Sequence, residues 1–394
     1  MEANTRRTFL KTIAAGAGAA AAAPALAADG DGHAAGTDVA SSADFVRTIP
    51  RKPGQPAPFT ASLDGGKIKA TSGGWARDVT ANQLPIATGI AGAHLYLNPG
   101  GVREMHWHAS AEWGYIVAGR CQATIIDPQG QREVVNLGAG DTWYFPNGHA
   151  HAIQTIGAAP CHAILAFDDG LYGEHGTFGL TDWMSRMEPA LLAKATGAPE
   201  AVVRAMPEGE TYIMQGPVVS LSQAAAREEA LDPARTHRYA LAKARPIAQS
   251  DGGVLRVASA REFPKSAAMT GFRLTLEPGA IQTPHWHPNA NEWLYLVKGR
   301  AKIGLFSPDK RMGGADLGPG DCAYIPRACG HVIESTGAEP CEIVGALDNG
   351  AYVESSLSQW LAQAPRHLLA ANLGLPEAAA EAIATRVVAI AAAT

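Results

Sequence analysis

Histidine and glutamate residues with a repeated spacing carry the clearest chemistry in this sequence. The set consists of two histidines around a tryptophan, a glutamate and a more distant histidine, first as His106, His108, Glu112 and His151 and then as His285, His287, Glu292 and His331. The second copy follows about 180 residues after the first, with one residue inserted before its glutamate. Such a repeat predicts two similar domains, each with one metal ion.

The ligand types favour particular ions. Side chains at positions i and i+2 of a strand share a face, so His106 and His108 can both point inward. A structural zinc site would be closed and rich in cysteine. Three imidazoles with one carboxylate instead leave two adjacent positions open on a six-coordinate ion, which suits Mn²⁺ or Fe²⁺ and a bidentate ligand. Trp107 and Trp286 should face the opposite way and pack.

Short apolar runs between glycine- and proline-containing turns predict the elements that position these ligands. The 43 Gly and 26 Pro lie mostly between such runs, which is typical of antiparallel strands and of an all-β fold. About eight strands per copy predict a jelly-roll barrel, followed by a helical stretch at 180–197 in the first copy and 357–374 in the second. The expected divisions are 1–27 signal, 28–55 flexible linker, 56–200 first barrel, 201–235 connecting segment, and 236–394 second barrel with C-terminal helices.

The N-terminus has the features of an export signal. Arg6 and Arg7 precede an Ala/Gly-rich apolar run that ends at Ala25-Leu26-Ala27, as in twin-arginine signal peptides. The alternative is a disordered alanine-rich leader. We therefore expect export to the periplasm or beyond, and the apolar run is too weak for a membrane anchor.

Charge and cysteine content narrow the possible partners. The formal net charge is −5, so nothing indicates binding to nucleic acid or to an anionic membrane. The five cysteines form no CxxC pair. Cys161 and Cys341 occupy equivalent positions of the repeat and are interpreted as buried thiols, with a disulfide as the alternative.

The motifs resemble those of a known family. Gly100 to Gly119, and Gly140 to His151, look like the two cupin motifs, and Gly279 to Gly299 repeats the first. The segment Arg103-Glu-Met-His106-Trp-His108, and the residues from Asp168-Asp169-Gly170 to Asp182-Trp183, are similar to those of bacterial oxalate decarboxylases. The resemblance implies manganese in both barrels and conversion of oxalate to formate and CO₂, with dioxygen as a cofactor. It also implies a homo-oligomer, either a trimer or a dimer of trimers.

The resemblance assigns roles in the first barrel. Arg103 matches the family's substrate arginine, although strict alternation from His106 would point Glu104 inward, so Arg103 requires an irregular start of the strand. Glu174 matches the lid glutamate, which we expect to donate a proton, while His175 departs from the small amide usual there. Tyr212 resembles a tyrosine that the family places near the substrate, with packing as the alternative. Trp143 is interpreted as either a substrate-binding pocket wall or core.

The second barrel keeps the metal ligands but lacks other features. Gln282 stands where an arginine would be expected, and Gly345 where relatives often carry a glutamate. We therefore interpret the second site as structural or electron-transferring. Three alternative functions remain: an oxalate oxidase that yields CO₂ and peroxide, a non-catalytic metal-binding bicupin, and a cupin dioxygenase or isomerase with another substrate.

Overall fold

The computed structural model describes residues 57–308, 311–383 and 386–393. The expected export signal, 1–27, and the expected flexible linker, 28–55, lie outside them. The side chains of Glu174 and His175 also lie outside the described part.

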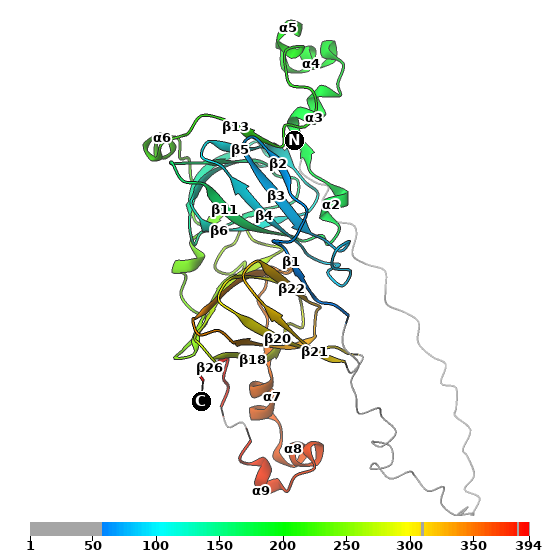
Figure 1. Cartoon of the computed structure of the whole chain (residues 1–394), viewed down its shortest axis with the longest axis vertical. Coiled ribbons are helices and arrows are strands. Elements are labelled where there is room, and N and C mark those ends of the chain that lie inside the picture. The colour runs from blue at the N-terminus through cyan, green and yellow to red at the C-terminus, as the bar shows by residue number, and fades with distance from the viewer. Residues whose placement is uncertain (1–56, 309–310, 384–385, 394) are drawn as a thin grey trace, which may run out of the picture. The chain divides into compact units, whose positions relative to one another are not determined.

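The first barrel consists of two antiparallel sheets (Figure 1). One has the order β14 (Arg238–Tyr239), β9 (Thr142–Phe145), β6 (Glu112–Ala118), β11 (Cys161–Phe167), β4 (Ala91–Leu97), β3 (Gly74–Val79) and β2 (Lys69–Thr71). The other has the order β12 (Phe178–Gly179), β5 (Gly101–Trp107), β10 (Ala150–Thr155), β7 (Arg120–Ile126) and β8 (Arg132–Gly138), with β13 (Ile213–Gln215) also paired to β5. Apolar side chains from both sheets fill the space between them.

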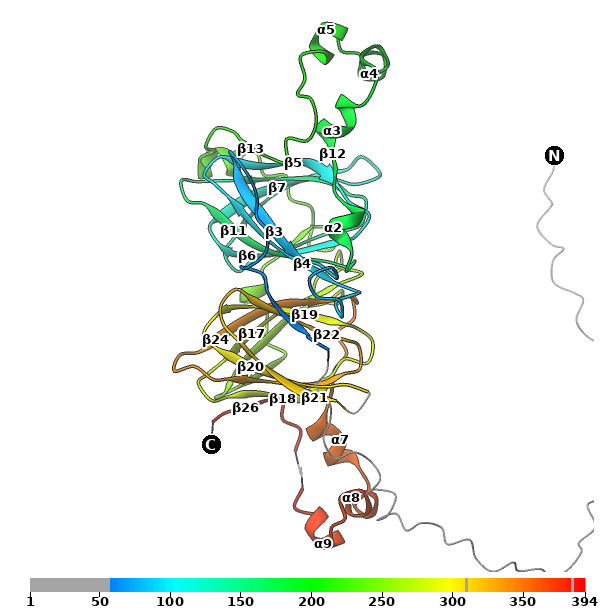
Figure 2. The same ribbon diagram turned by 45° about the vertical axis from the view of Figure 1, so that its right-hand side comes forward.

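The second barrel repeats this arrangement (Figure 2). One sheet has the order β1 (Thr60–Ser62), β22 (Asp321–Ile325), β19 (Glu292–Lys298), β24 (Cys341–Leu347), β17 (Thr270–Leu276), β16 (Gly253–Ala258) and β15 (Ala248–Ser250). The other has the order β21 (Met312–Leu317), β20 (Ala301–Phe306), β23 (Gly330–Ser335), β18 (Ile281–Trp286) and β25 (Ser355–Ser356), with β26 (Ile390–Ala391) also on β18. The predicted all-β fold of two jelly-roll barrels is confirmed.

Each barrel is completed by a strand that precedes the other barrel in the chain. The N-terminal strand β1 pairs with β22 of the second barrel. The strand β14, which comes just before the second barrel, pairs with β9 of the first. The expected first-barrel range, 56–200, therefore includes one strand of the second barrel, and the expected second-barrel range, 236–394, includes one strand of the first.

The segment 201–235 joins the barrels but is not free chain. It begins in α5 (Glu200–Val203), adds β13 to the ligand-bearing strand β5, and continues as α6 (Leu221–Ala226). The amide of Gln122 donates to the carbonyl of Ala224 at 2.9 Å, which holds α6 on the first barrel. Backbone pairing of Val134 with Glu229 holds the next stretch.

Two tryptophans pack across the boundary between the barrels. A Cβ at Gly92 of β4 would lie 2.0 Å from the indole of Trp293, and one at Gly271 of β17 would lie 2.1 Å from the indole of Trp113. Each indole therefore occupies the space that a side chain on the facing strand would fill. Both are fully buried, so the two barrels share one apolar interface.

The helices after each barrel are shorter than the sequence predicts. The expected helix over 180–197 is divided into α3 (Leu180–Ser185) and α4 (Pro189–Thr196), because Pro189 begins a new helix. The second stretch is divided into α7 (Leu357–Gln363) and α8 (Arg366–Leu373), followed by α9 (Glu377–Ala380). Gly197 and Gly374 end α4 and α8 in left-handed conformation, as predicted for C-terminal glycines.

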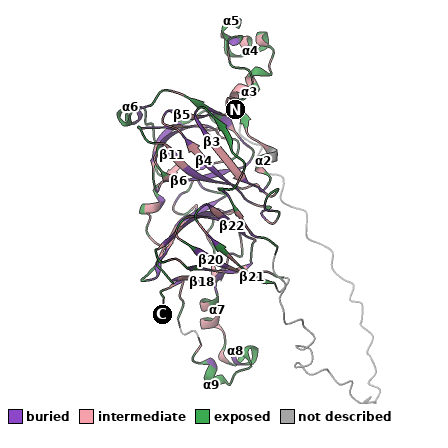
Figure 3. Cartoon of the chain, in the orientation of Figure 1, coloured by how far each residue is buried: buried purple, intermediate pink, exposed green. Residues whose placement is uncertain are grey.

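Two further findings concern the cysteines and the helices. All five cysteines are buried and none of them forms a disulfide, which confirms the interpretation as thiols. Among the described residues, no helix has both the length and the apolar character needed to cross a bilayer. The helices after each barrel carry much exposed surface (Figure 3).

Candidate metal centres

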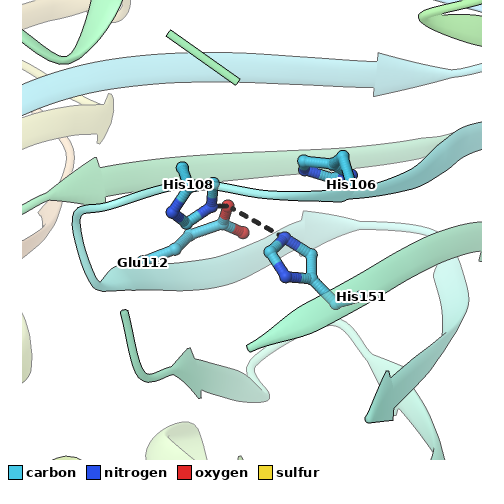
Figure 4. Close-up of side chains that lie close together, drawn as sticks. All are labelled: His106, His108, Glu112 and His151. Atoms are coloured by element: carbon cyan, nitrogen blue, oxygen red, sulfur yellow. Dashed lines mark hydrogen bonds and ion pairs between the residues drawn. The ribbon is translucent and has the colours of Figure 1, made fainter. Parts of the chain in front are cut away.

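The first histidine and glutamate set converges inside the first barrel. His106, His108, Glu112 and His151 are 1–3% exposed, and one ligand atom from each lies within 4.8 Å of the others. His106 and His151 are directly opposite one another on β5 and β10, and Glu112 begins β6. Figure 4 shows the four side chains directed toward a common point. Residues far apart in the sequence thus meet because β5 and β10 pair in one sheet while β6 belongs to the other sheet of the same barrel.

A bulge in β5 places both a ligand and the arginine on the inner face. His106 pairs with His151, and Arg103 pairs with Ile153, so three residues of β5 span two of β10. The extra residue interrupts the alternation of side chains. Arg103 is therefore 6% exposed even though Glu104 beside it is 1% exposed. The structure thus has the irregular strand that this position requires.

The imidazoles are oriented by backbone carbonyls. The Nδ1 atoms of His106, His108 and His151 lie 2.6, 2.6 and 2.9 Å from the carbonyls of Glu104, Ser110 and His149. A carbonyl only accepts, so each Nδ1 carries the proton and each Nε2 keeps a lone pair. The Nε2 of His151 is buried and has no hydrogen-bond partner among the described residues. A bound cation would satisfy it, so the residues fit a metal ion.

Hydrogen bonds fix the carboxylate of Glu112 and keep it charged. Its Oε1 accepts from the indole N–H of Trp143 at 2.7 Å, and its Oε2 lies 3.1 Å from His108 Nε2. Burial alone would raise the pKa of Glu112, but interactions with His108 and His151 outweigh it and hold the pKa well below its usual range. Burial, with the positive charge of Arg103, lowers the pKa of His106 far below its usual value. At neutral pH these residues are thus an anionic carboxylate and a neutral imidazole, the forms that bind metal.

The second set has the same construction. His285, His287, Glu292 and His331 are 1–4% exposed and also lie within 4.8 Å of one another. The three Nδ1 atoms face the carbonyls of Thr283, Val353 and Cys329 at 2.8, 2.8 and 3.1 Å. Buried atoms of Glu292 (Oε2) and His331 (Nε2) have no hydrogen-bond partner among the described residues. This set therefore fits a cation equally well.

A cavity of about 450 Å³ borders the first set. Arg103, His106 and Glu112 line it, together with apolar side chains from β4, β10 and β11. Lys67, Lys69 and Arg77 also line it, and their charges suit an anionic ligand. A hollow of about 430 Å³ in the second barrel lies against β20, β21 and β23 and includes no ligand of the second set.

Tyr212 fixes the guanidinium of Arg103. Its carbonyl accepts from Arg103 Nη1 at 3.0 Å, and the guanidinium carbon lies 4.3 Å from the centre of its ring. Lys69 Nζ lies 3.7 Å from the same ring. Tyr212 has a φ of 58°, a left-handed conformation that is costly for tyrosine. It lines the cavity, so packing and a place at the ligand pocket are both present.

For Trp143, the sequence left two positions open, a substrate-binding pocket wall and the core. The side chain is fully buried and is not among the residues that line the cavity, so the core position is correct and the substrate-binding role is wrong. Its ring packs in the core of the first barrel while its N–H donates to Glu112. Trp143 therefore acts on the carboxylate of Glu112 rather than on a bound substrate.

In the expected lid segment, the structure describes the backbone at Glu174 but not its side chain. Glu174 lies in the short helix α2 (Tyr172–His175), and Gly176 follows with a φ of 74°. Tyr172 fixes the start of this segment, because its ring stacks on Phe167 at 3.6 Å between centroids. The structure thus places the helix beside the pocket that Tyr172 lines. The proton-donating role of Glu174 stays a prediction.

Glu104 belongs to the site, although the sequence analysis assigned it no role there. Its carboxylate accepts from the hydroxyl of Thr181 at 2.6 Å and from the backbone N–H of Tyr212 at 2.7 Å. It therefore joins the segment after the lid to the loop that holds Arg103. The available signal was the break in alternation on β5, which places two adjacent charged residues on the inner side.

In the second barrel, the residues that differ occupy the expected positions. Gln282 pairs with Ile333 across the same bulge, and its Nε2 lies 3.2 Å from His285 Nε2. At Gly345 a Cβ would lie 2.3 Å from the carbonyl oxygen of Trp293 and 2.6 Å from the ring of Phe272. The second barrel therefore has no room there for a glutamate.

Comparisons with known proteins agree with this architecture. The cupin family model matches residues 63–204 and again 239–381. Oxalate decarboxylase OxdC of Bacillus subtilis is 35% identical over 304 residues, covering 77% of this chain and 78% of that protein. A probable oxalate decarboxylase of Arthroderma benhamiae is 32% identical over 318 residues, covering 80% and 78%.

Solved structures give the same result. A structure of B. subtilis oxalate decarboxylase at pH 4.6 matches with a TM-score of 0.81 and 31% identity, covering 88% of this chain and 90% of that one. A structure from work on the Mn(II) centres of the same enzyme matches with a TM-score of 0.80 and 31% identity, covering 87% and 91%.

Proposed function

Because this chain belongs to the cupin family, as a bicupin of the oxalate decarboxylase type, we propose that it converts oxalate to formate and CO₂ as a manganese-dependent carboxy-lyase. The observation that carries the proposal is the cavity that brings Arg103 together with the first metal set. Two Mn²⁺ ions per chain, with Fe²⁺ as a possible substitute, and dioxygen are the cofactors. When bound, the metal supplies open coordination positions and one-electron chemistry.

Arg103 is proposed to bind the carboxylate of oxalate that lies farther from the metal. One Nη donates to Tyr212, so the remaining N–H groups of its planar fork are available for a carboxylate. The stacking on Tyr212 holds the fork in place before the substrate arrives. Lys67, Lys69 and Arg77 attract the dianion toward the inner pocket.

Glu174 is proposed to supply the proton that converts the decarboxylated fragment to formate. A carboxyl group enclosed in a dry pocket has a raised pKa, since desolvation disfavours the anion, and can then act as an acid. Gly173 and Gly176 on either side give the lid segment backbone freedom. Loss of this proton transfer would favour oxidation to CO₂ and peroxide.

The second site is proposed to hold metal for stability or electron transfer, without turnover. Gln282 is neutral and cannot compensate a dianion as Arg103 does. The segment at the position of the lid is also fixed, because His287 donates to the carbonyl of Val353 at 2.8 Å and Tyr352 donates to Glu354 at 2.5 Å. A substrate has less freedom to enter there.

A homo-oligomer is proposed, either a trimer or a dimer of trimers. The helices that follow each barrel expose large apolar side chains, including Trp183 at 54%, Leu191 at 57% and Trp360 at 66%. Such side chains are typical of surfaces that another copy covers. We also propose export by the twin-arginine route to the periplasm or beyond, on the basis of Arg6, Arg7 and the apolar run after them.

The deciding experiment measures the products of oxalate under air with Mn-loaded protein. Formate in nearly equimolar yield to the oxalate consumed is the expected result. Peroxide without formate would identify an oxidase, and the absence of both products would favour a metal-binding protein or another substrate.

A further inference from the structure

One buried cluster of ionisable side chains in the first barrel has no role in the proposed reaction. Glu133 of β8 and His237, just before β14, are 1% and 2% exposed. His237 Nδ1 donates to Glu133 Oε2 at 2.5 Å, and the backbone N–H of His237 donates to the same oxygen at 2.8 Å. The other oxygen accepts from the hydroxyl of Thr236 at 2.6 Å and the N–H of Leu231 at 3.0 Å.

These bonds set the charge and the tautomer. Burial would raise the pKa of Glu133, but the hydrogen bonds from His237 and Thr236 outweigh it and lower the pKa, so the carboxylate is anionic. An anionic carboxylate accepts a hydrogen bond from the Nδ1–H of His237, so the proton stays on Nδ1 and the lone pair is on Nε2. A histidine that donates its other nitrogen to a carboxylate is the usual arrangement of a metal ligand.

A second histidine, His149, lies beside the ring of His237. The Nε2 of His237 and the Nδ1 of His149 are both buried, and neither has a hydrogen-bond partner among the described residues. The two rings lie 5.6 Å apart between centroids at an angle of 62°. Ring pairs within the two metal sets lie 4.0–5.9 Å apart at angles of 43–83°. The spacing of His149 and His237 falls within this range.

The repeat shows that the fold does not require this cluster. In the second barrel, β1 takes the place of β14, and Tyr324 N–H donates to the carbonyl of Phe59 as Tyr144 N–H donates to that of His237. Phe59 therefore stands where His237 stands in the first barrel. It is 5% exposed and belongs to the apolar core of its barrel.

In the second barrel, the positions equivalent to Glu133 and His149 also lack a carboxylate or an imidazole. Leu305 pairs with Gly313 in the second barrel as Ile125 pairs with Glu133 in the first, so Gly313 replaces the glutamate. Cys329 stands at the position of His149, two residues before the last ligand of its metal set. A phenylalanine and a small residue thus suffice to close the barrel. Burying Glu133 with the imidazole of His237 costs free energy that a bound cation would offset.

We propose that His149 and His237 bind a third divalent ion in the first barrel, with Glu133 orienting His237. Two imidazoles without a carboxylate ligand favour Zn²⁺ or Cu²⁺ over Mn²⁺, because affinity for nitrogen ligands rises along that series. His149 is partly exposed, so water completes the coordination from its side. The site is independent of oxalate turnover and of the two sets that hold manganese.

The test is a Zn²⁺ titration of untagged, Mn-loaded full-length protein, with both metals counted after gel filtration. The expected result is one Zn²⁺ per chain in addition to two Mn²⁺. His237→Phe, which installs the residue of the second barrel, and His149→Leu should each abolish zinc uptake and keep two Mn²⁺. Glu133→Gln should weaken zinc binding by about 10- to 100-fold, the effect usual for a lost orienting carboxylate.

His162→Gln is the matched control, because His162 is a partly buried imidazole on the same barrel whose ring packs on Tyr96. It should leave zinc uptake unchanged. The proposal is overturned if the parent protein holds only two ions, if zinc enters only as manganese leaves, or if His237→Phe still binds zinc. Retention of two Mn²⁺ by His237→Phe shows that the variant is folded.

Discussion

Replacing Arg103 with glutamine gives the first barrel the residue that the second barrel carries at the equivalent position, Gln282. The guanidinium is 6% exposed and stacked on Tyr212, so its contacts with a carboxylate form in a site shielded from water. A hydrogen bond to a charged group contributes about 1.5–3 kcal/mol. Loss of a two-bond contact therefore reduces kcat/KM by about 10²–10⁴-fold, at roughly 1.4 kcal/mol per factor of ten.

The metal content and fold should not change. Arg103 contributes no ligand, and the carbonyl of Tyr212 still accepts from the N–H of Glu104 at 3.0 Å. The assay is formate production against oxalate concentration, with manganese counted in the same sample. Lys67→Gln removes one charge from the same cavity and should change kcat/KM by less than about threefold, and Gln282→Ala should be nearly neutral. Near-parent activity in Arg103→Gln, or a large loss in Gln282→Ala, would refute the assignment of turnover to the first site.

Three further predictions follow from the contacts. Glu174→Ala should reduce formate production by about 10²-fold or more, the effect usual for a lost acid, with two Mn²⁺ retained; unchanged formate yield would exclude Glu174 as the proton donor. Trp143→Phe removes the 2.7 Å hydrogen bond to Glu112, so one of the two Mn²⁺ should be lost about 10- to 100-fold more readily to a chelator; equal retention of both would show that the indole does not support the ligand. Metal-free protein should lose thermal stability as the pH falls below about 6.5, because burial lowers the pKa of His94 and His162 and lowers that of His149 to about 4, so the unfolded chain takes up protons first. A melting temperature that stays constant from pH 7 to pH 5 would contradict this.

The sequence by itself determined the two barrels and the eight ligands. Strand alternation places His106 and His108 on one face, independently of the neighbouring strands. The same motif at His285 and His287 shows that the spacing is not a chance match. Gly197 predicted the helix end, since a residue without a Cβ adopts left-handed backbone at little cost. These inferences hold because each depends on neighbouring positions along the chain.

Only the tertiary structure decided the features that depend on distant segments. Whether Arg103 faces the pocket is fixed by its pairing with β10, which holds one residue fewer than β5 at the bulge. The role of Trp143 depends on Glu112, which lies on a different strand. The exchange of β1 and β14 between barrels, and the pairing of Glu133 with His237, join positions about 100 or more residues apart. Local spacing carries no information on such contacts, because packing of the whole chain selects them.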